Sequence, residues 1–137
     1  CIKKYRMESL LGKWRLLKNE GFDNFLKFTR IPWYQRKIAG YCSIDLEILK
    51  DGHTYEKRVF SRFYKTVEKI IFCDNYITSG TTRKKYSYEN GVVYVDVLGS
   101  IVNWKELIYY DEPNLVVEYN WTESDGTVKT AKQTFKP

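Results

Sequence analysis

The stretch GKWRLLKNEGFDNFLKFTRIPWYQRKIAG, residues 12–40, decides the fold, because it places a helical insert in a chain otherwise rich in strand signals. Pro32 can begin a second helix that ends near Gly40, since a proline needs no N–H donor in the first helical turn. Neither helix is long enough to be stable alone in water, so its apolar side must rest on another part of the protein. The first helix is predicted by apolar spacing at i, i+3, i+4 and i+7, formed by Phe22, Phe25, Leu26 and Thr29.

Beyond residue 40 the sequence alternates apolar and polar residues and is interrupted by turn signals. Asn-Gly and Asp-Gly pairs adopt the positive-φ positions of tight hairpin turns easily. Strands of this number and spacing, with no helices between them, predict an antiparallel meander that closes as a barrel or pairs as a sandwich. Two short helices after the first strand would then form a lid on a barrel mouth. The breaks are Asp51-Gly52, Asp74-Asn75, Gly80, Asn90-Gly91, Glu112-Pro113-Asn114 and Asp125-Gly126.

Several predicted strands carry charged residues at both alternating positions, as in HTYEKRV (53–59) and YKTVEKII (64–71). A sheet packed on a dry core shows one clean apolar face. The mixed pattern favours a partly polar interior, as in a barrel that encloses a ligand cavity. Edge strands would give the same mixture, and this alternative stays open.

Length and composition favour one folded domain over the 137 residues, with residues 1–7 as an N-terminal extension and 22–40 as a helical lid. A content of 43% hydrophobic and 17% aromatic residues is too apolar for a disordered chain. The start lacks the apolar core of a signal peptide, which predicts a cytoplasmic protein; the alternative is secretion after cleavage before Cys1. Cys1, Cys42 and Cys73 lack zinc-site spacing and are expected to be reduced thiols.

A formal charge of +6 is compatible with anionic membranes, nucleic acid or acidic ligands. A basic, aromatic barrel that binds single-stranded nucleic acid is a distant alternative, because no strand carries the concentrated basic and aromatic motif that such proteins use. An enzyme is disfavoured, because the sole histidine, His53, lies beside a turn glycine and no nucleophile–base pair is readable. We therefore expect no catalytic residues, no metal and no cofactor.

Four segments carry a resemblance to a known family. They are Gly12-Lys13-Trp14 with Glu20-Gly21-Phe22-Asp23 and Phe25-Leu26, then Trp33-Tyr34-Gln35-Arg36, SRFYKT (61–66) and WKEL (104–107). In these segments the chain resembles the intracellular lipid-binding proteins, which include the fatty-acid-binding and cellular retinoid-binding proteins. The resemblance runs from about residue 8 to the end and is densest over residues 10–37.

The resemblance implies an all-β fold, a ten-stranded antiparallel up-and-down barrel with a helix-turn-helix lid between the first two strands. It implies non-covalent binding and transport of a long-chain fatty acid or a related hydrophobic ligand by a monomer. The alternative is a carrier of retinol or another neutral lipid. The ligand-binding residues that it implies are Phe22, Phe25, Leu26, Trp33, Phe63, Lys105, Gln133 and Phe135.

The headgroup residues depart from the family pattern. Lys105 stands where the resemblance implies an interior arginine, and Gln133-Thr134-Phe135 replaces the terminal Arg-x-Tyr. The glutamine and phenylalanine are closer to the retinol-binding branch. A buried ammonium is costly unless it is paired, so Lys105 would need a ligand carboxylate or an internal acid such as Glu118. A one-residue change of strand register would turn Lys105 to the outside.

A basic surface is predicted on the helical insert. We expect it to contact anionic membranes or a lipid-receiving protein during ligand transfer, or to serve import into the nucleus. The alternative is an ordinary solvated helix surface. The residues are Lys27, Arg30, Arg36 and Lys37.

Overall fold

The computed structural model describes residues 7–62 and 64–137, so the predictions for Cys1 and Phe63 fall outside the described residues. No helix in these two ranges is long and apolar enough to cross a bilayer. The elements in chain order are the 3₁₀ helix η1 (Met7–Leu10), β1 (Gly12–Glu20), α1 (Phe22–Phe28), α2 (Trp33–Tyr41), β2 (Ile44–Asp51), β3 (Thr54–Ser61), β4 (Lys65–Ile70), β5 (Ile77–Ser79), β6 (Thr82–Glu89), β7 (Val92–Leu98), β8 (Asn103–Asp111), β9 (Asn114–Thr122) and β10 (Val128–Lys136).

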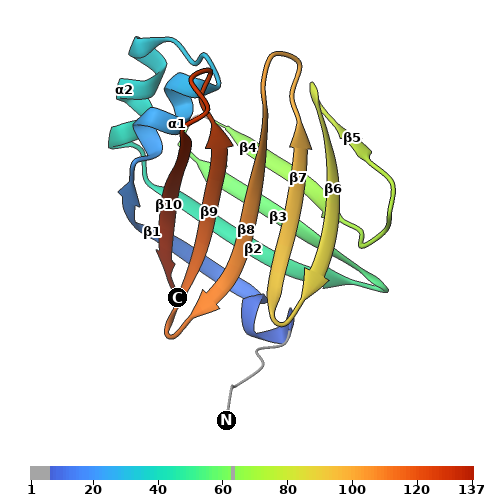
Figure 1. Cartoon of the computed structure of the whole chain (residues 1–137). Coiled ribbons are helices and arrows are strands. Elements are labelled where there is room, and N and C mark those ends of the chain that lie inside the picture. Colours follow the sequence, from blue (N-terminus) through green and yellow to red (C-terminus); the bar gives the residue numbers. More distant parts are fainter. Residues whose placement is uncertain (1–6, 63) are drawn as a thin grey trace.

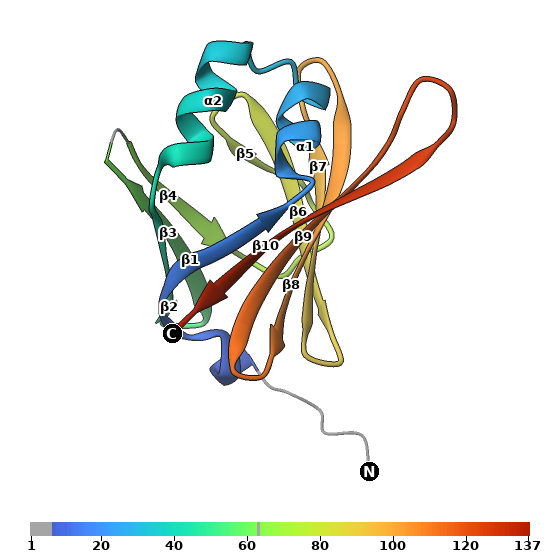
Figure 2. The ribbon, with the colours of Figure 1, turned by 90° about the vertical axis from the view of Figure 1, so that its left-hand side faces the viewer.

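The ten strands form one antiparallel sheet that curls into a nearly closed barrel (Figures 1 and 2). The sheet order is β4-β3-β2-β1-β10-β9-β8-β7-β6-β5, so β1 pairs with both β2 and β10. The two ends of this order, β4 and β5, are not joined by a ladder of backbone hydrogen bonds. The predicted ten-stranded barrel, with two helices between the first two strands, is therefore confirmed. We call this break in backbone pairing between β4 and β5 the seam.

The hairpin turns lie at the predicted dipeptides. Gly52 has φ 62°, Gly126 has φ 87°, and Asn90 and Gly91 have φ 52° and 84°. Two consecutive positive φ angles match the right-handed twist of the flanking strands, which is why Asn-Gly suits a two-residue turn. The short-range turn chemistry of the sequence thus sets where the strands end.

One end of the barrel is closed by η1 and the other end is covered by α1 and α2 (Figure 1). Met7 and Leu10 of η1 are buried in the main core, and Trp14 Nε1 donates a hydrogen bond of 3.0 Å to the carbonyl of Leu10. Met7, the last residue of the expected extension, therefore packs inside the barrel.

Helix α1 is fixed to the barrel wall at its first turn and through one aromatic side chain. Gly21 precedes the helix with φ 68°, and a Cβ at this position would lie 3.2 Å from the carbonyl oxygen of Thr130. Glycine adopts this φ with the least strain, and any side chain here would press against the carbonyl of Thr130 on the barrel wall. Phe25 then packs against Trp121 and Ala131.

Candidate functional site

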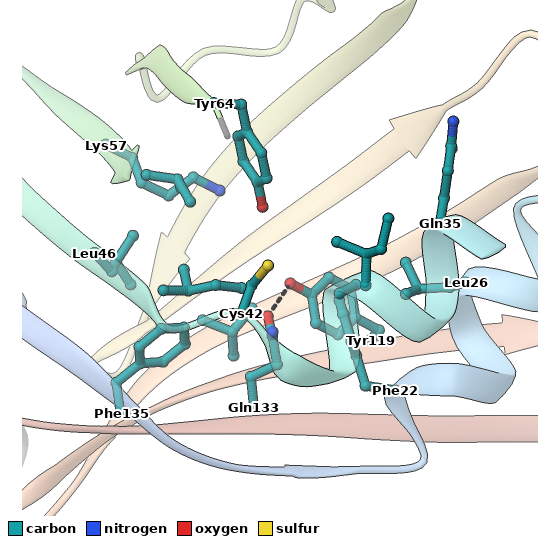
Figure 3. A pocket seen from close by; sticks show the side chains of 15 residues that line it. Phe22, Leu26, Gln35, Cys42, Leu46, Lys57, Tyr64, Tyr119, Gln133 and Phe135 are labelled. Atoms are coloured by element: carbon teal, nitrogen blue, oxygen red, sulfur yellow. Dashed lines mark hydrogen bonds between the residues drawn. The ribbon is translucent and has the colours of Figure 1, made fainter. Parts of the chain in front are cut away.

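A cavity of about 540 Å³ lies between the helical lid and the inner face of the barrel (Figure 3). This volume is within the range of pockets that hold small molecules. Ile38 and Tyr64 line the cavity and are 50% and 49% exposed, so the cavity reaches solvent beside α2. The lining residues are Phe22, Leu26, Gln35, Ile38, Ala39, Cys42, Ile44, Leu46, Lys57, Val59, Tyr64, Val117, Tyr119, Gln133 and Phe135.

Four of the residues expected to bind ligand line this cavity: Phe22, Leu26, Gln133 and Phe135. Phe25 is buried behind the lining, where it packs on Trp121. The prediction that Trp33 lines the cavity is wrong, because Trp33 is not among the lining residues and its side chain is 68% exposed. Successive residues of a helix are about 100° apart, so a residue two positions before Gln35 points away from the cavity.

The prediction that the ammonium of Lys105 faces the cavity is also wrong. In β8, Glu106 and Ile108 are buried, whereas Lys105 is exposed on the outer face, paired in register with Asp96 and Asn120. Side chains of a strand alternate between the two faces, so the inward position belongs to Glu106. The interior at this point carries a carboxylate where a cation was expected.

The interior cations come instead from Lys57 on β3 and Lys84 on β6. Both surround the carboxylate of Glu68 on β4: Lys84 Nζ lies 3.0 Å from each carboxylate oxygen, and Lys57 Nζ lies 3.4 Å from Oε2. Tyr86 and Ser79 donate longer hydrogen bonds of 3.4 Å to the same carboxylate. Because β4 and β6 lie on opposite sides of the seam, the Glu68–Lys84 contact joins the two edges of the barrel.

The protonation states of this cluster follow from burial and charge. Burial favours the neutral acid at Glu68, but the ammoniums of Lys57 and Lys84 outweigh burial and lower the pKa of Glu68 to about 2. Burial likewise opposes the charge on Lys84, yet the carboxylates of Glu106 and Glu68 raise the pKa of that ammonium above its ordinary value. Glu68 and Lys84 are therefore held in their charged forms at neutral pH.

A neutral hydrogen-bonding pair lies deeper in the cavity. The hydroxyl of Tyr119 donates a hydrogen bond of 2.7 Å to Oε1 of Gln133 (Figure 3). Burial, with the carboxylate of Glu106 next in importance, raises the pKa of Tyr119 well above its ordinary value, so the phenol stays protonated. Glu106 itself accepts a hydrogen bond of 2.9 Å from Trp104 Nε1.

Lys57 and Glu68 were not predicted as interior residues, although their positions in the strand alternation indicate it. Lys57 alternates in step with Tyr55 and Val59, and Glu68 shares its strand face with Ile70; Tyr55 and Val59 pack against the core, and Ile70 is part of it. Charges in these positions are the mixed pattern that favoured a polar interior. Since β4 is also an edge strand of the sheet, both explanations of that pattern apply to it.

The predicted basic surface is present in part. Lys27, Arg30 and Lys37 are exposed on the helical lid. Arg36 is turned inward: its Nη1 donates a hydrogen bond of 2.8 Å to the carbonyl of Ile31, and its Nε lies 3.3 Å from Asp23. Arg36 thus ties α2 to α1 and does not belong to the outward surface.

No cluster of three or more metal-ligating side chains occurs within residues 7–62 and 64–137. Cys42 and Cys73 are free thiols in the structure, as expected for these two residues. Cys42 lines the cavity beside α2. The chemistry available to a ligand in the cavity is therefore apolar contact, one ammonium and a few neutral hydrogen-bonding groups.

No protein-family model matches the chain. Fatty acid-binding protein homolog 7 of Caenorhabditis elegans is 28% identical over 89 residues, which cover 62% of this chain and 65% of that protein. The matched part is thus less than two thirds of that relative's own length. This relative confirms the resemblance read from the sequence.

Solved structures share the fold over nearly the whole chain. Apo lipid binding protein 8 of Caenorhabditis elegans superposes with a TM-score of 0.86 and 19% identity, covering 98% of this chain and 100% of that chain. A fatty acid binding protein of Schistosoma mansoni in complex with arachidonic acid superposes with a TM-score of 0.82 and 17% identity, over 95% and 96% of the two chains. At these identities the comparison shows the fold alone.

Proposed function

We propose that this chain is a non-enzymatic carrier that binds a long-chain fatty acid or a related hydrophobic ligand in its interior cavity and transports it. The observation that carries the proposal is the cavity of about 540 Å³ under the helical lid. Its wall is mostly apolar, with Leu26, Val117 and Phe135 among the lining residues. Removing an acyl chain from water stabilises a complex by ~0.8 kcal/mol per methylene before opposing terms. The relative named for fatty acid binding supports the same class of ligand.

A neutral lipid such as a retinol-type alcohol is the second candidate. It is favoured by the Tyr119–Gln133 pair in the cavity. This pair offers hydrogen bonds without a net charge. The two candidates share the cavity and differ in the headgroup.

Filling the cavity from the lid is expected to abolish most of the binding. Ala39 lies on α2 and lines the cavity, so Ala39→Trp would occupy the space that the ligand needs. We expect at least a tenfold loss of oleate affinity, since a ligand excluded from the cavity loses several methylenes of apolar contact. Affinity would be measured by displacement of the neutral fluorescent dye Nile red.

The matched control is Lys37→Trp, which adds the same side chain on the exposed side of the same helix. This variant should bind oleate as the wild type does. Thermal unfolding of both variants checks that the barrel is intact. Unchanged oleate binding by a folded Ala39→Trp protein would contradict the proposed site.

The exposed basic surface formed by Lys27, Arg30 and Lys37 supports transfer of the ligand at anionic membranes. Each cation near an anionic surface contributes about 1 kcal/mol of attraction, and salt screens it. We propose this surface as the contact with a membrane or lipid-receiving protein for a carrier that works as a monomer in the cytoplasm. The same three cations are the groups that a nuclear import receptor would bind.

Neutralising the three cations with glutamine is expected to slow transfer of a fluorescent fatty acid to anionic vesicles by about tenfold at low salt. Transfer by the wild type should also slow as salt is added. The control replaces three exposed lysines away from the helices, Lys13, Lys50 and Lys136, with glutamine. Equal transfer rates for the two triple variants would refute the membrane contact.

A further inference from the structure

Among the described residues that line the cavity, Lys57 is the one charged side chain. Glu68, Lys84 and Glu106, the other interior charges described above, are not part of the lining. The side chain of Lys57 is 12% exposed, so its ammonium is largely removed from water. A cation in this position faces the space that the ligand would fill.

The ammonium of Lys57 is the less tightly held of the two that share Glu68. Lys84 Nζ contacts both carboxylate oxygens at 3.0 Å, whereas Lys57 Nζ contacts one of them at 3.4 Å. An ammonium has three N–H donors, and the contact with Glu68 engages one side of it. With Glu106 counted, the described interior ammoniums and carboxylates are equal in number, so Lys57 offers a ligand its unengaged N–H donors. The second interior acid, Glu106, is bonded to Trp104 and stabilises the charge of Lys84.

Neutral donors lie within the same cavity. Figure 3 shows the ammonium of Lys57 and the hydroxyl of Tyr64 pointing into the same part of the cavity. Gln133 uses its oxygen to accept from Tyr119, which leaves its amide N–H groups as donors. An anion with two acceptor oxygens matches the Lys57 ammonium together with the Tyr64 hydroxyl beside it (Figure 3). The bond to the ammonium would be the stronger one, because both partners are charged.

We infer that Lys57 is the headgroup site of this protein and selects ligands that end in a carboxylate. The inference rests on the proposed function, because it assumes that the cavity holds an amphiphile. The carboxylate contacts Lys57 Nζ on the side away from Glu68, and the acyl chain lies against the apolar wall. The specificity residue is thus on β3, far along the chain from Lys105 and Gln133.

The test compares oleate with oleyl alcohol, which has the same chain and no charge. The wild type should prefer oleate by about tenfold, the size of one charge-assisted hydrogen bond. Lys57→Met should remove this preference by weakening oleate binding about tenfold while oleyl alcohol binds as before. Lys57→Arg keeps the charge and should keep most of the preference. Affinities would again come from Nile red displacement.

Lys105→Met is the matched control, because it removes a lysine from the outer face of the barrel. It should leave both affinities unchanged. Lys57→Gln provides a polar substitute if Lys57→Met does not fold, with the same expected loss of preference. Equal affinity of the wild type for both lipids, or an equal loss of both in a folded Lys57 variant, would overturn the inference. Binding of neither lipid by the wild type would instead overturn the proposed function.

Discussion

Replacing Glu68 with glutamine is expected to lower the free energy of unfolding by about 3–5 kcal/mol at pH 7. The carboxylate holds two interior ammoniums, and the side chain of Lys84 is only 9% exposed. Without the Glu68 carboxylate, these two ammoniums remain in the interior with no acid between them. Removing one partner of a buried ion pair costs more than the pair contributes, because it leaves the other charge unpaired. The variant also loses the ion pair that joins β4 to β6 across the seam. Urea unfolding followed by tryptophan fluorescence measures the change.

Asp45→Asn is the matched control for this variant. Asp45 forms a cross-strand ion pair with Arg15 at 3.3 Å, but both side chains are more than half exposed. Exposed pairs contribute about 0–1 kcal/mol, so the control should change the free energy of unfolding by no more than that. A similar small effect for Glu68→Gln would contradict the structural role assigned to the buried cluster.

The pH dependence of stability gives an independent check on Glu68. Its pKa falls from an ordinary value of 4.5 to about 2 in the folded protein. A depressed pKa in the folded state contributes stability that is complete above about pH 4.5 and is lost as the pH falls toward 2. The shift corresponds to about 3 kcal/mol. The wild type and Glu68→Gln should therefore converge in stability toward pH 2, and a constant difference from pH 7 to pH 2 would refute this origin.

Replacing Phe25 with alanine is expected to reduce the free energy of unfolding by about 3 kcal/mol and to loosen the lid. The ring is 5% exposed and lies among four aromatic rings, with centroid distances of 4.5 Å to Tyr119, 5.4 Å to Trp104, 5.5 Å to Trp121 and 6.0 Å to Phe22. The seven residues of α1 are too few to form a stable helix without this packing. Amide hydrogen exchange in α1 should speed up, and Nile red should dissociate faster in stopped-flow measurements.

Leu17→Ala is the control for Phe25→Ala, because Leu17 is an apolar side chain on β1 that is 51% exposed. Truncating an exposed side chain should change the free energy of unfolding by less than about 0.5 kcal/mol. Full protection of the α1 amides in a folded Phe25→Ala protein would show that another contact fixes the lid.

The elements of the fold could be predicted from the sequence because the interactions that specify them are local. Asn90-Gly91 adopts the two positive φ angles of its turn within the dipeptide itself. The spacing of Phe22, Phe25 and Leu26 likewise predicted the helix that the structure contains, Phe22–Phe28. The resemblance carried by the first forty residues then indicated how these elements assemble.

Which of Lys105 and Glu106 points into the barrel could not be predicted in the same way. Both alternating positions of β8 carry large apolar side chains, with Trp104 and Ile108 on one face and Leu107 and Tyr109 on the other. The alternation therefore does not identify the inner face. Pairing with β7 and β9 decides it, since those strands already have buried inner positions such as Val95 and Val117.

The sequence by itself determined the strands, the turns and the early helical insert, because each of these depends on residues close together in the chain. Only the tertiary structure decided the polar interior. Lys57, Glu68 and Lys84 lie on three different strands, and Glu68 meets Lys84 where β4 and β6 face each other across the seam. The strength of their interaction depends on distances and burial that exist only once the barrel has closed. The same closure turned Lys57, and not Lys105, toward the cavity.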